Sequence, residues 1–219
     1  MCRNLNVKKW LYRFFSLFII TSCLYLFFEI AGFLHTEKLI TFDQLVMKNI
    51  PFFHSEGLTA IFSFLTSLAS VTFTSTITIM LCACFFFFKK RKEGWILALS
   101  VAGGGLFNYV LKAVYERQRP DIDQLIEVSG FSFPSGHSMN AVTLYGMLAV
   151  LCFFMMNRLT LKLMNGIGFC LLIFLIGVSR VYLGVHYVSD VIAGYLAGFA
   201  WISAVILLYR SMSVKKKKV

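Results

Sequence analysis

Residues 187–209 read YVSDVIAGYLAGFAWISAVILLY and carry a single charged side chain, Asp190. A helix needs about 20 mainly apolar residues to cross the roughly 30 Å hydrocarbon core of a bilayer, so this stretch is long enough to span one. The whole chain agrees, because 58% of its 219 residues are hydrophobic and 14% are charged. Soluble domains are about half apolar and a quarter charged. The sequence therefore predicts an all-α integral membrane protein.

Five further apolar runs precede this one, and together they predict a polytopic protein with six transmembrane helices. The predicted spans are residues 14–33, 60–88, 94–111, 138–156, 163–178 and 187–209. The fifth run is short, and the second, rich in Ser and Thr, is long enough to tilt. No linker or repeat interrupts the chain, so we expect one domain over residues 1–219.

The net charge of +11 is a signal of membrane topology, and no nucleic-acid partner is expected. Fifteen of the 21 basic residues flank apolar runs: Arg3, Lys8, Lys9 and Arg13; Lys89, Lys90, Arg91 and Lys92; Arg158 and Lys162; Arg210 and Lys215 to Lys218. With six spans these clusters share one side, which the positive-inside rule assigns to the cytoplasm. We expect both termini in the cytoplasm of a cell-membrane protein, with some attraction to anionic membrane lipids.

The first predicted outer connection, residues 34–59, contains a short amphipathic helix. Apolar residues recur there at helical spacing against polar ones: Phe42, Leu45, Val46 and Ile50 against Asp43, Gln44, Lys48 and Asn49. This pattern is typical of a helix lying in the headgroup layer. Its simplest role is to anchor the loop, and guidance of a substrate is the alternative.

Ionisable residues gather at the predicted outer ends of the third to sixth spans. They are Lys112, Arg119, His137, Arg180, His186 and Asp190. A charged side chain at the centre of a spanning helix costs about 2.5–3.5 kcal/mol on insertion scales, so such residues usually have a partner or a function. Three cations meeting at one level would form a site for a multiply charged anion.

Lys112 and Arg119 are candidate ligands of that anion. Pro120 cannot continue a helix and biases Arg119 towards an extended conformation, which lets its side chain turn inward. The guanidinium can bind two phosphate oxygens at once, and the ammonium supplies a compact charge. Taken alone, both residues could be cations that extend to the membrane boundary.

Phe133-Pro134-Ser135-Gly136-His137 precedes the fourth span. Ser135 is a typical N-cap residue, and Gly136 lets the backbone N–H groups of a helix start approach phosphate oxygens. His137 would be held close to them. The alternative is ordinary turn and capping chemistry beside an uninvolved histidine.

The segment from Ser179 to Asp190 contains a candidate nucleophile. His186 and Asp190 are four residues apart and share one face of a helix. A carboxylate that accepts the N–H of one ring nitrogen leaves the other nitrogen free to attack phosphorus. A buried His–Asp pair that only holds two helices is the alternative. Joint occurrence with the other segments favours an enzyme, because phosphate ester hydrolysis needs a nucleophile, an acid and several positive charges together.

These motifs resemble the type 2 phosphatidic acid phosphatase family. Its pattern is Lys-(six)-Arg-Pro, then Pro-Ser-Gly-His, then Ser-Arg-(five)-His-(three)-Asp, and it is complete between Lys112 and Asp190. The resemblance implies that His186 is the nucleophile, oriented by Asp190, and that His137 protonates the leaving oxygen. Lys112, Arg119 and Arg180, with Ser135 and Gly136, would bind the phosphate. It implies neither a metal nor another cofactor.

By this resemblance the chain is a lipid phosphatase that acts at the outer membrane face through a phosphohistidine. Bacterial members acting on phosphatidylglycerol phosphate or undecaprenyl diphosphate look most similar, and phosphatidic acid is a third possible substrate. The alternatives are a lipid phosphotransferase with an alcohol acceptor and a transporter of anions or lipids. A transporter predicts an inverted repeat, which the sequence lacks. No obligatory protein partner is evident, and we expect Gly194 and Gly198 to pack within the bundle.

Overall fold

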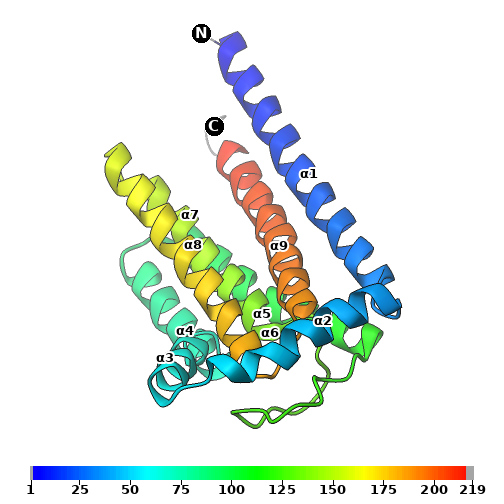
Figure 1. Ribbon diagram of the computed structural model, residues 1–219. Coiled ribbons are helices and arrows are strands. Elements are labelled where there is room, and N and C mark those ends of the chain that lie inside the picture. Colours follow the sequence, from blue (N-terminus) through cyan, green and yellow to red (C-terminus); the bar gives the residue numbers. More distant parts are fainter. Residues whose placement is uncertain (1, 216–219) are drawn as a thin grey trace.

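The apolar runs form helices that lie side by side in one bundle (Figure 1). The structure is a computed structural model that describes residues 2–215, and in these residues it contains no strand. The elements are α1 (Cys2–Gly32), α2 (Glu37–Asn49), η1 (Ile50–Phe53), α3 (Glu56–Ser67), α4 (Val71–Phe87), α5 (Arg91–Tyr115), α6 (Gly136–Ala141), η2 (Val142–Gly146), α7 (Met147–Met155), α8 (Leu159–Tyr182) and α9 (Val188–Lys215).

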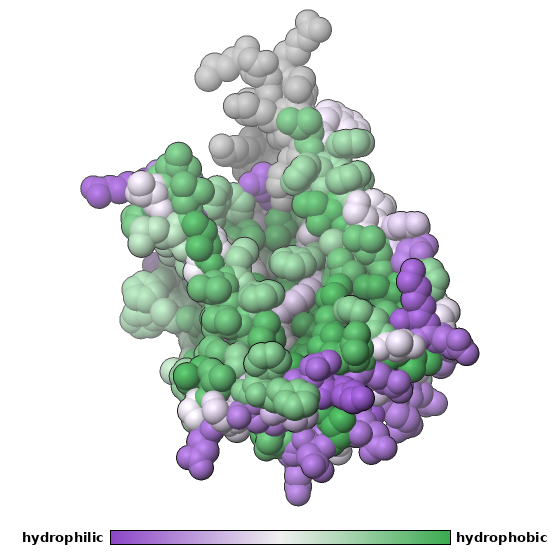
Figure 2. Space-filling model, in the orientation of Figure 1, coloured by the Kyte–Doolittle hydropathy of each residue, from purple (hydrophilic) through white to green (hydrophobic). Residues whose placement is uncertain are grey.

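The helices have the length and apolar surface of membrane spans. Five are long and apolar enough to cross a bilayer, and α3 with α4 form a bent pair that makes a sixth candidate. Large apolar side chains point outward, including Phe14, which is 70% exposed, and Trp95, which is 67% exposed. Apolar side chains cover the side of the bundle, and hydrophilic ones gather mainly at one end (Figure 2). The predicted all-α membrane fold is confirmed.

The second predicted span is broken, which corrects the expectation of one tilted helix over residues 60–88. It consists of α3 and α4, bent by 48°. Ser70 is extended, and its side chain accepts a hydrogen bond from the N–H of Phe73, so it starts a new helix. The carbonyls freed at the break have partners, because Tyr145 donates to Leu68 O and Asn140 donates to Ala69 O. These bonds permit an interruption inside an apolar bundle.

Helix α2 is the helix predicted in the connection over residues 34–59, but Asp43 does not lie on its solvent-facing side. The side chain of Asp43 is fully buried, as is Met47 one turn later. Phe42 and Leu45 are exposed by contrast, at 49% and 60%. The sequence pattern placed Asp43 among the outward polar residues, and the structure turns it into the protein. The reason is an ion pair between Asp43 and Arg117.

The centre of the bundle is formed by α6 and η2 packed against α9. Two glycines permit this packing, because a Cβ on Gly194 would lie 2.6 Å from Ser135 O and one on Gly198 would lie 2.8 Å from Val142 Cβ. The two glycines therefore pack against other helices of the same bundle, as predicted. The π-helical η2 interrupts the α-helical register between Ala141 and Met147, and Ser100 donates a hydrogen bond to Thr143 O within it.

Segments distant in the sequence meet at one end of the bundle. The end of α5, the start of α6, the end of α8 and the start of α9 lie there, with α2 across them (Figure 1). The start of α1 and the end of α9 lie at the opposite end. Lys216, Lys217 and Lys218 of the last basic cluster lie outside the described residues.

Candidate active site

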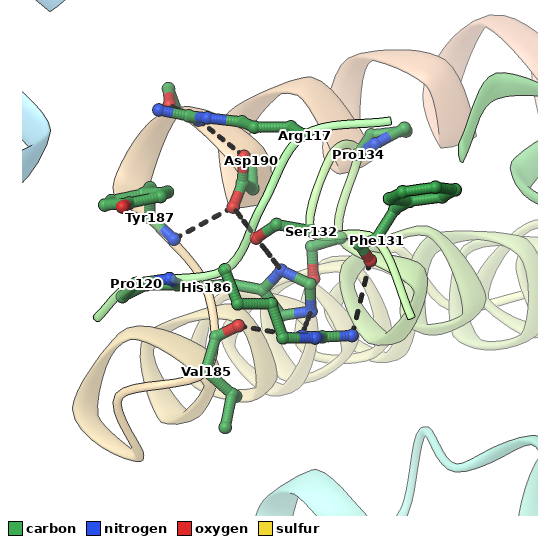
Figure 3. A network of polar contacts seen from close by, with 12 residues as sticks. Arg117, Pro120, Phe131, Ser132, Pro134, Val185, His186, Tyr187 and Asp190 are labelled. Carbon is green, nitrogen blue, oxygen red and sulfur yellow. Dashed lines mark hydrogen bonds and ion pairs between the residues drawn. The ribbon is translucent and has the colours of Figure 1, made fainter. Parts of the chain in front are cut away.

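His186 and Asp190 form a buried pair where the chain enters α9. Asp190 lies in the first turn of the helix, and its Oδ2 is 3.5 Å from Nδ1 of His186. Ser132 lies between them, 3.2 Å from Nδ1, and donates a hydrogen bond to Asp190 Oδ2 (Figure 3). The backbone N–H of Tyr187 also donates to this oxygen, at 2.9 Å. The predicted pair is present, and a serine from the loop before α6 completes it.

The contacts of His186 define which ring nitrogen carries the proton. Nη1 of Arg119 is 3.3 Å from Nε2. A guanidinium can only donate hydrogen bonds, so Nε2 must accept and keeps its lone pair. The proton of the neutral ring then lies on Nδ1, facing Asp190 and Ser132. In this tautomer Nε2 is the ring nitrogen whose lone pair could attack phosphorus.

Burial keeps the ring of His186 neutral. Only 2% of the residue is exposed. Burial lowers the pKa of His186 to about 4, and the hydrogen bond and charge of Asp190 offset this only in part. An unprotonated imidazole is the form that can attack phosphorus. At neutral pH, Nε2 of His186 therefore carries a lone pair and no proton.

Arg180 is a buried cation with unused donors. Its residue surface is 1% exposed, and Nη1 donates a hydrogen bond to Thr66 Oγ1 at 2.6 Å. Within the described residues, Nε and Nη2 are buried and have no hydrogen-bond partner. Buried charged donors without partners are rare because desolvation is costly. An anion that accepts from both nitrogens would remove that cost.

Lys112 and Arg119 converge on the same region and also hold the loop between α5 and α6. Nζ of Lys112 donates to the carbonyl of Phe131 and lies 3.5 Å from that of Ser132. Arg119 donates to Val185 O at 2.8 Å and to Gly130 O at 2.9 Å. The charges of Arg119, Asp190 and Arg180 all act on Lys112. The three predicted cations therefore lie together.

His137 lies beside this group in the first turn of α6. Its ring is half-buried, and the charges of Arg180, His186, Arg119 and Lys112 act on it. Among the described residues, none forms a hydrogen bond with the His137 ring. Both ring nitrogens are available to a ligand. His137 is thus placed where it could exchange a proton with a group bound near His186.

Ser135 and Gly136 shape the start of α6. Ser135 is the N-cap residue, as predicted, and its buried hydroxyl accepts hydrogen bonds from the N–H and the hydroxyl of Ser138. A Cβ on Gly136 would lie 3.0 Å from Asn108 Oδ1 and 3.8 Å from Cε of Lys112. Gly136 therefore lets α6 approach Lys112 closely. Their predicted contacts with phosphate remain a prediction.

The chain is similar to known proteins over the region that contains the site. Residues 93–213 match the PAP2 superfamily. The chain belongs to the PAP2 superfamily. It is a multi-pass membrane enzyme of this metal-independent family and removes phosphate from lipid phosphates.

One relative from Bacillus subtilis and two solved structures, from Bacillus subtilis and Aquifex aeolicus, extend the similarity beyond the matched residues. Phosphatidylglycerophosphatase B of Bacillus subtilis (strain 168) is 36% identical over 180 residues, which cover 80% of this chain and 87% of that protein. The crystal structure of the transmembrane PAP2 type phosphatidylglycerolphosphate phosphatase from Bacillus subtilis has a TM-score of 0.79 at 32% identity, covering 91% of this chain and 98% of that one. Aquifex aeolicus LpxE has a TM-score of 0.59 at 26% identity, covering 80% and 96%.

Two residues of this PAP2 site belong to none of the predicted motifs. Arg117 donates to Asp190 Oδ1 at 2.6 Å and to Asp43 Oδ2 at 2.8 Å. Ser132 links His186 to Asp190. The one available signal was that Arg117 is a third basic residue close to Lys112 and Arg119. Ser132 lies in a loop with no regular spacing, so no pattern marked it.

Proposed function

We propose that this PAP2 enzyme hydrolyses the terminal phosphate monoester of phosphatidylglycerol phosphate at the outer membrane face, through a phosphohistidine on His186. The observation that carries the mechanism is a neutral, buried imidazole whose Nε2 lone pair lies among cations. One of them, Arg180, has two unpartnered buried nitrogens. A phosphoryl group with its three negatively charged oxygens fits both features.

In the first step Nε2 of His186 attacks phosphorus, and the bond from phosphorus to the lipid oxygen breaks. The phosphate must draw Nη1 of Arg119 away from Nε2. The guanidinium then donates its hydrogen bond to a phosphate oxygen and no longer to the ring nitrogen. Arg180 and Lys112 bind the other oxygens. His137 gives a proton to the leaving lipid oxygen. Asp190 stabilises the positive charge that develops on the ring.

In the second step water attacks phosphorus and the phosphorus–nitrogen bond of His186 breaks. His137, which has just given up its proton, accepts one from the water. Inorganic phosphate leaves, and Nε2 regains its lone pair. The enzyme returns to the state in which Arg119 donates to that nitrogen.

The orientation rests on the basic clusters. The site lies at the end of the bundle opposite the start of α1 and the end of α9 (Figure 1). Two spans begin at that opposite end with Arg13 and Arg91, and Arg158 directly precedes a third. The positive-inside rule assigns it to the cytoplasm, so the site faces outward and the substrate presents its phosphate there.

The choice of phosphatidylglycerol phosphate rests on the similarity to phosphatidylglycerophosphatase B of Bacillus subtilis, which extends over 80% of this chain. It is tested by measuring phosphate release from phosphatidylglycerol phosphate, undecaprenyl diphosphate and phosphatidic acid in detergent with a chelator present. We expect phosphatidylglycerol phosphate to have the highest kcat/KM. A higher value for either competitor would overturn the substrate assignment.

The mechanism is tested with His186→Ala, using His35→Ala as the matched control because His35 is exposed and lies outside the site. We expect the first variant to be inactive and the second to match the native enzyme. Radiolabelled phosphate from the substrate should stay bound to native protein quenched in alkali and be released in acid, as phosphohistidine requires. Turnover by His186→Ala would exclude this nucleophile. When a short alcohol is present, formation of its phosphate monoester in place of inorganic phosphate would indicate a phosphotransferase.

A further inference from the structure

A chain of buried charges runs from α2 to the His186–Asp190 pair. Asp43 and Asp190 are both fully buried, and the side chain of Arg117 is 12% exposed. The guanidinium bridges them, with Nη2 on Asp43 and Nη1 on Asp190. Breaking a buried pair by removing one partner usually leaves an uncompensated charge. The position of Arg117 therefore depends on both carboxylates.

Asp43 also holds the first turn of α9 directly. Its Oδ1 accepts the backbone N–H of Ser189 at 3.2 Å, and its Oδ2 accepts the hydroxyl of Ser189. A carboxylate at this place satisfies a free N–H of a helix N-terminus and complements the helix dipole. Asp190 is the next residue. Asp43 thus constrains the orienting carboxylate through the backbone as well as through Arg117.

The two oxygens of Asp190 have separate partners. Oδ1 accepts only from Arg117 among the described residues, whereas Oδ2 accepts from Ser132 and Tyr187 and faces Nδ1 of His186. Rotation of the carboxylate would therefore break the bond to Arg117. Arg117 is itself held against the Tyr187 ring, 4.2 Å from its centroid. The geometry of the nucleophile is fixed from behind by this network.

Asp43 moderates the charge of Arg117 as well as its position. Burial alone would lower the pKa of Arg117, but Asp190 and Asp43 outweigh burial and raise it. The guanidinium is therefore fully charged. Without Asp43 that whole charge would act on Asp190 and weaken the carboxylate's hold on the Nδ1 proton. With Asp43 it is shared between two carboxylates.

We propose that Asp43 and Arg117 are positioning residues for the reaction, through which α2 holds Asp190 and His186 in the attacking geometry. In the part of the chain that the structure describes, no hydrogen bond or ion pair joins either residue to His186, and Arg119, not Arg117, contacts Nε2. They should therefore change the rate of phosphoryl transfer and leave phosphate binding unaltered. The inference rests on the proposed role of His186 as nucleophile.

The test compares Asp43→Asn with Glu37→Gln in the full-length protein in detergent, using phosphatidylglycerol phosphate and a chelator. Glu37 is an exposed acid in the first turn of the same helix, so its variant is a matched control. At metal sites, loss of a residue that orients a ligating side chain typically costs about 10- to 100-fold in affinity or activity. We expect a fall in kcat of about 10-fold for Asp43→Asn, with KM and the inhibition constant of vanadate within about twofold.

Two further variants separate positioning from folding. Asp43→Glu keeps the charge and should recover part of the lost kcat. Arg117→Gln should lower kcat, and adding Asp43→Asn to it should cost less than the sum of the two single losses, because Asp43 acts partly through Arg117. Fully additive losses, or a kcat for Asp43→Asn equal to that of Glu37→Gln, would overturn the proposal. So would a loss that only follows the amount of folded protein.

His186→Ala distinguishes the failure of this inference from the failure of the proposed function. If His186→Ala is inactive and Asp43→Asn is fully active, only the positioning role is wrong. If His186→Ala retains activity, the nucleophile assignment is wrong, and the positioning role falls with it.

Discussion

Burial of unpaired Arg180 nitrogens lowers the stability of the ligand-free protein, and a bound anion offsets that loss. Its guanidinium is almost fully buried, and two of its three nitrogens have no partner among the described residues. Unsatisfied buried donors cost about 1–3 kcal/mol, and more when charged. The folded enzyme without phosphate is therefore less stable than its packing alone would make it.

Replacing Arg180 with methionine should separate stability from activity. We expect Arg180→Met to abolish phosphate release and to raise the free energy of unfolding of the ligand-free protein by roughly 1–3 kcal/mol, because the unpaired donors are removed. Thermal unfolding in detergent would measure this. Vanadate should raise the unfolding temperature of the native protein and not that of Arg180→Met. Arg158→Met, exposed at the opposite end of the bundle, is the control, and a less stable Arg180→Met would contradict the expectation.

The lowered pKa of His186 predicts when its ring takes up a proton. Because burial lowers the pKa to about 4, the ring should stay neutral between the ordinary histidine value of about 6.5 and about pH 4. Nitrogen NMR of histidine-labelled protein in micelles would follow the titration, with His186→Gln identifying the signal. Protonation above about pH 6 would contradict the burial that the structure assigns to this ring.

At the scale of single residues, the motif residues could be predicted and their supports could not. Charges at the ends of apolar runs mark the motif residues, and the structure brings these residues together. They are Lys112, Arg119, His137, Arg180, His186 and Asp190. Asp43 was missed because its partner Arg117 is 74 residues away. Helical spacing classifies a residue by its own helix and contains no information on a partner of opposite charge elsewhere.

At the scale of helices, the contact between α9 and α6 depends on the absence of side chains. A Cβ on Gly194 would lie 2.6 Å from the carbonyl oxygen of Ser135 and 3.0 Å from Cβ of Ser138. The first of these is backbone, which cannot rotate away. Any side chain there must push apart the helices that carry Asp190 and His137.

The variant Gly194→Ala should therefore lose both stability and activity. We expect destabilisation of roughly 1–3 kcal/mol, the usual cost of overpacking, with a fall in kcat because His137 and His186 move apart. Gly105→Ala is the control, since a Cβ there has no atom within 4 Å. Thermal unfolding and phosphate release would be measured on both. Equal stability of the two variants would contradict the close approach of α6 and α9.

Helix existence followed from the sequence, and helix continuity did not. Every predicted apolar run is helical, but the run over residues 60–88 is two helices. Its Ser and Thr content suggested tilt. The break is stabilised by Tyr145 and Asn140, which bind the free carbonyls of Leu68 and Ala69 from another part of the chain. Local composition could not reveal those donors.

At the scale of the whole molecule, the arrangement predicts which end of the bundle faces the cell exterior. We expect Glu127→Cys, in the exposed loop near the site, to react with a membrane-impermeant maleimide on intact cells. Arg91→Cys, exposed at the start of α5, should react only after the cells are permeabilised. Both changes are made in a background without the native cysteines. The opposite labelling pattern would invert the topology derived from the basic clusters.

The irregular segment between α5 and α6 depends on Lys112 and Arg119, which lie near His186. Lys112 and Arg119 bind the carbonyls of Ser129, Gly130, Phe131 and Ser132. Loops usually tolerate insertions and vary in sequence during evolution. A longer loop here would move the carbonyl acceptors away from Lys112 and Arg119. Insertions among related enzymes should therefore accumulate before Ser129 and be excluded after it. The part of the chain with the least regular structure would thus be among the least free to vary in length.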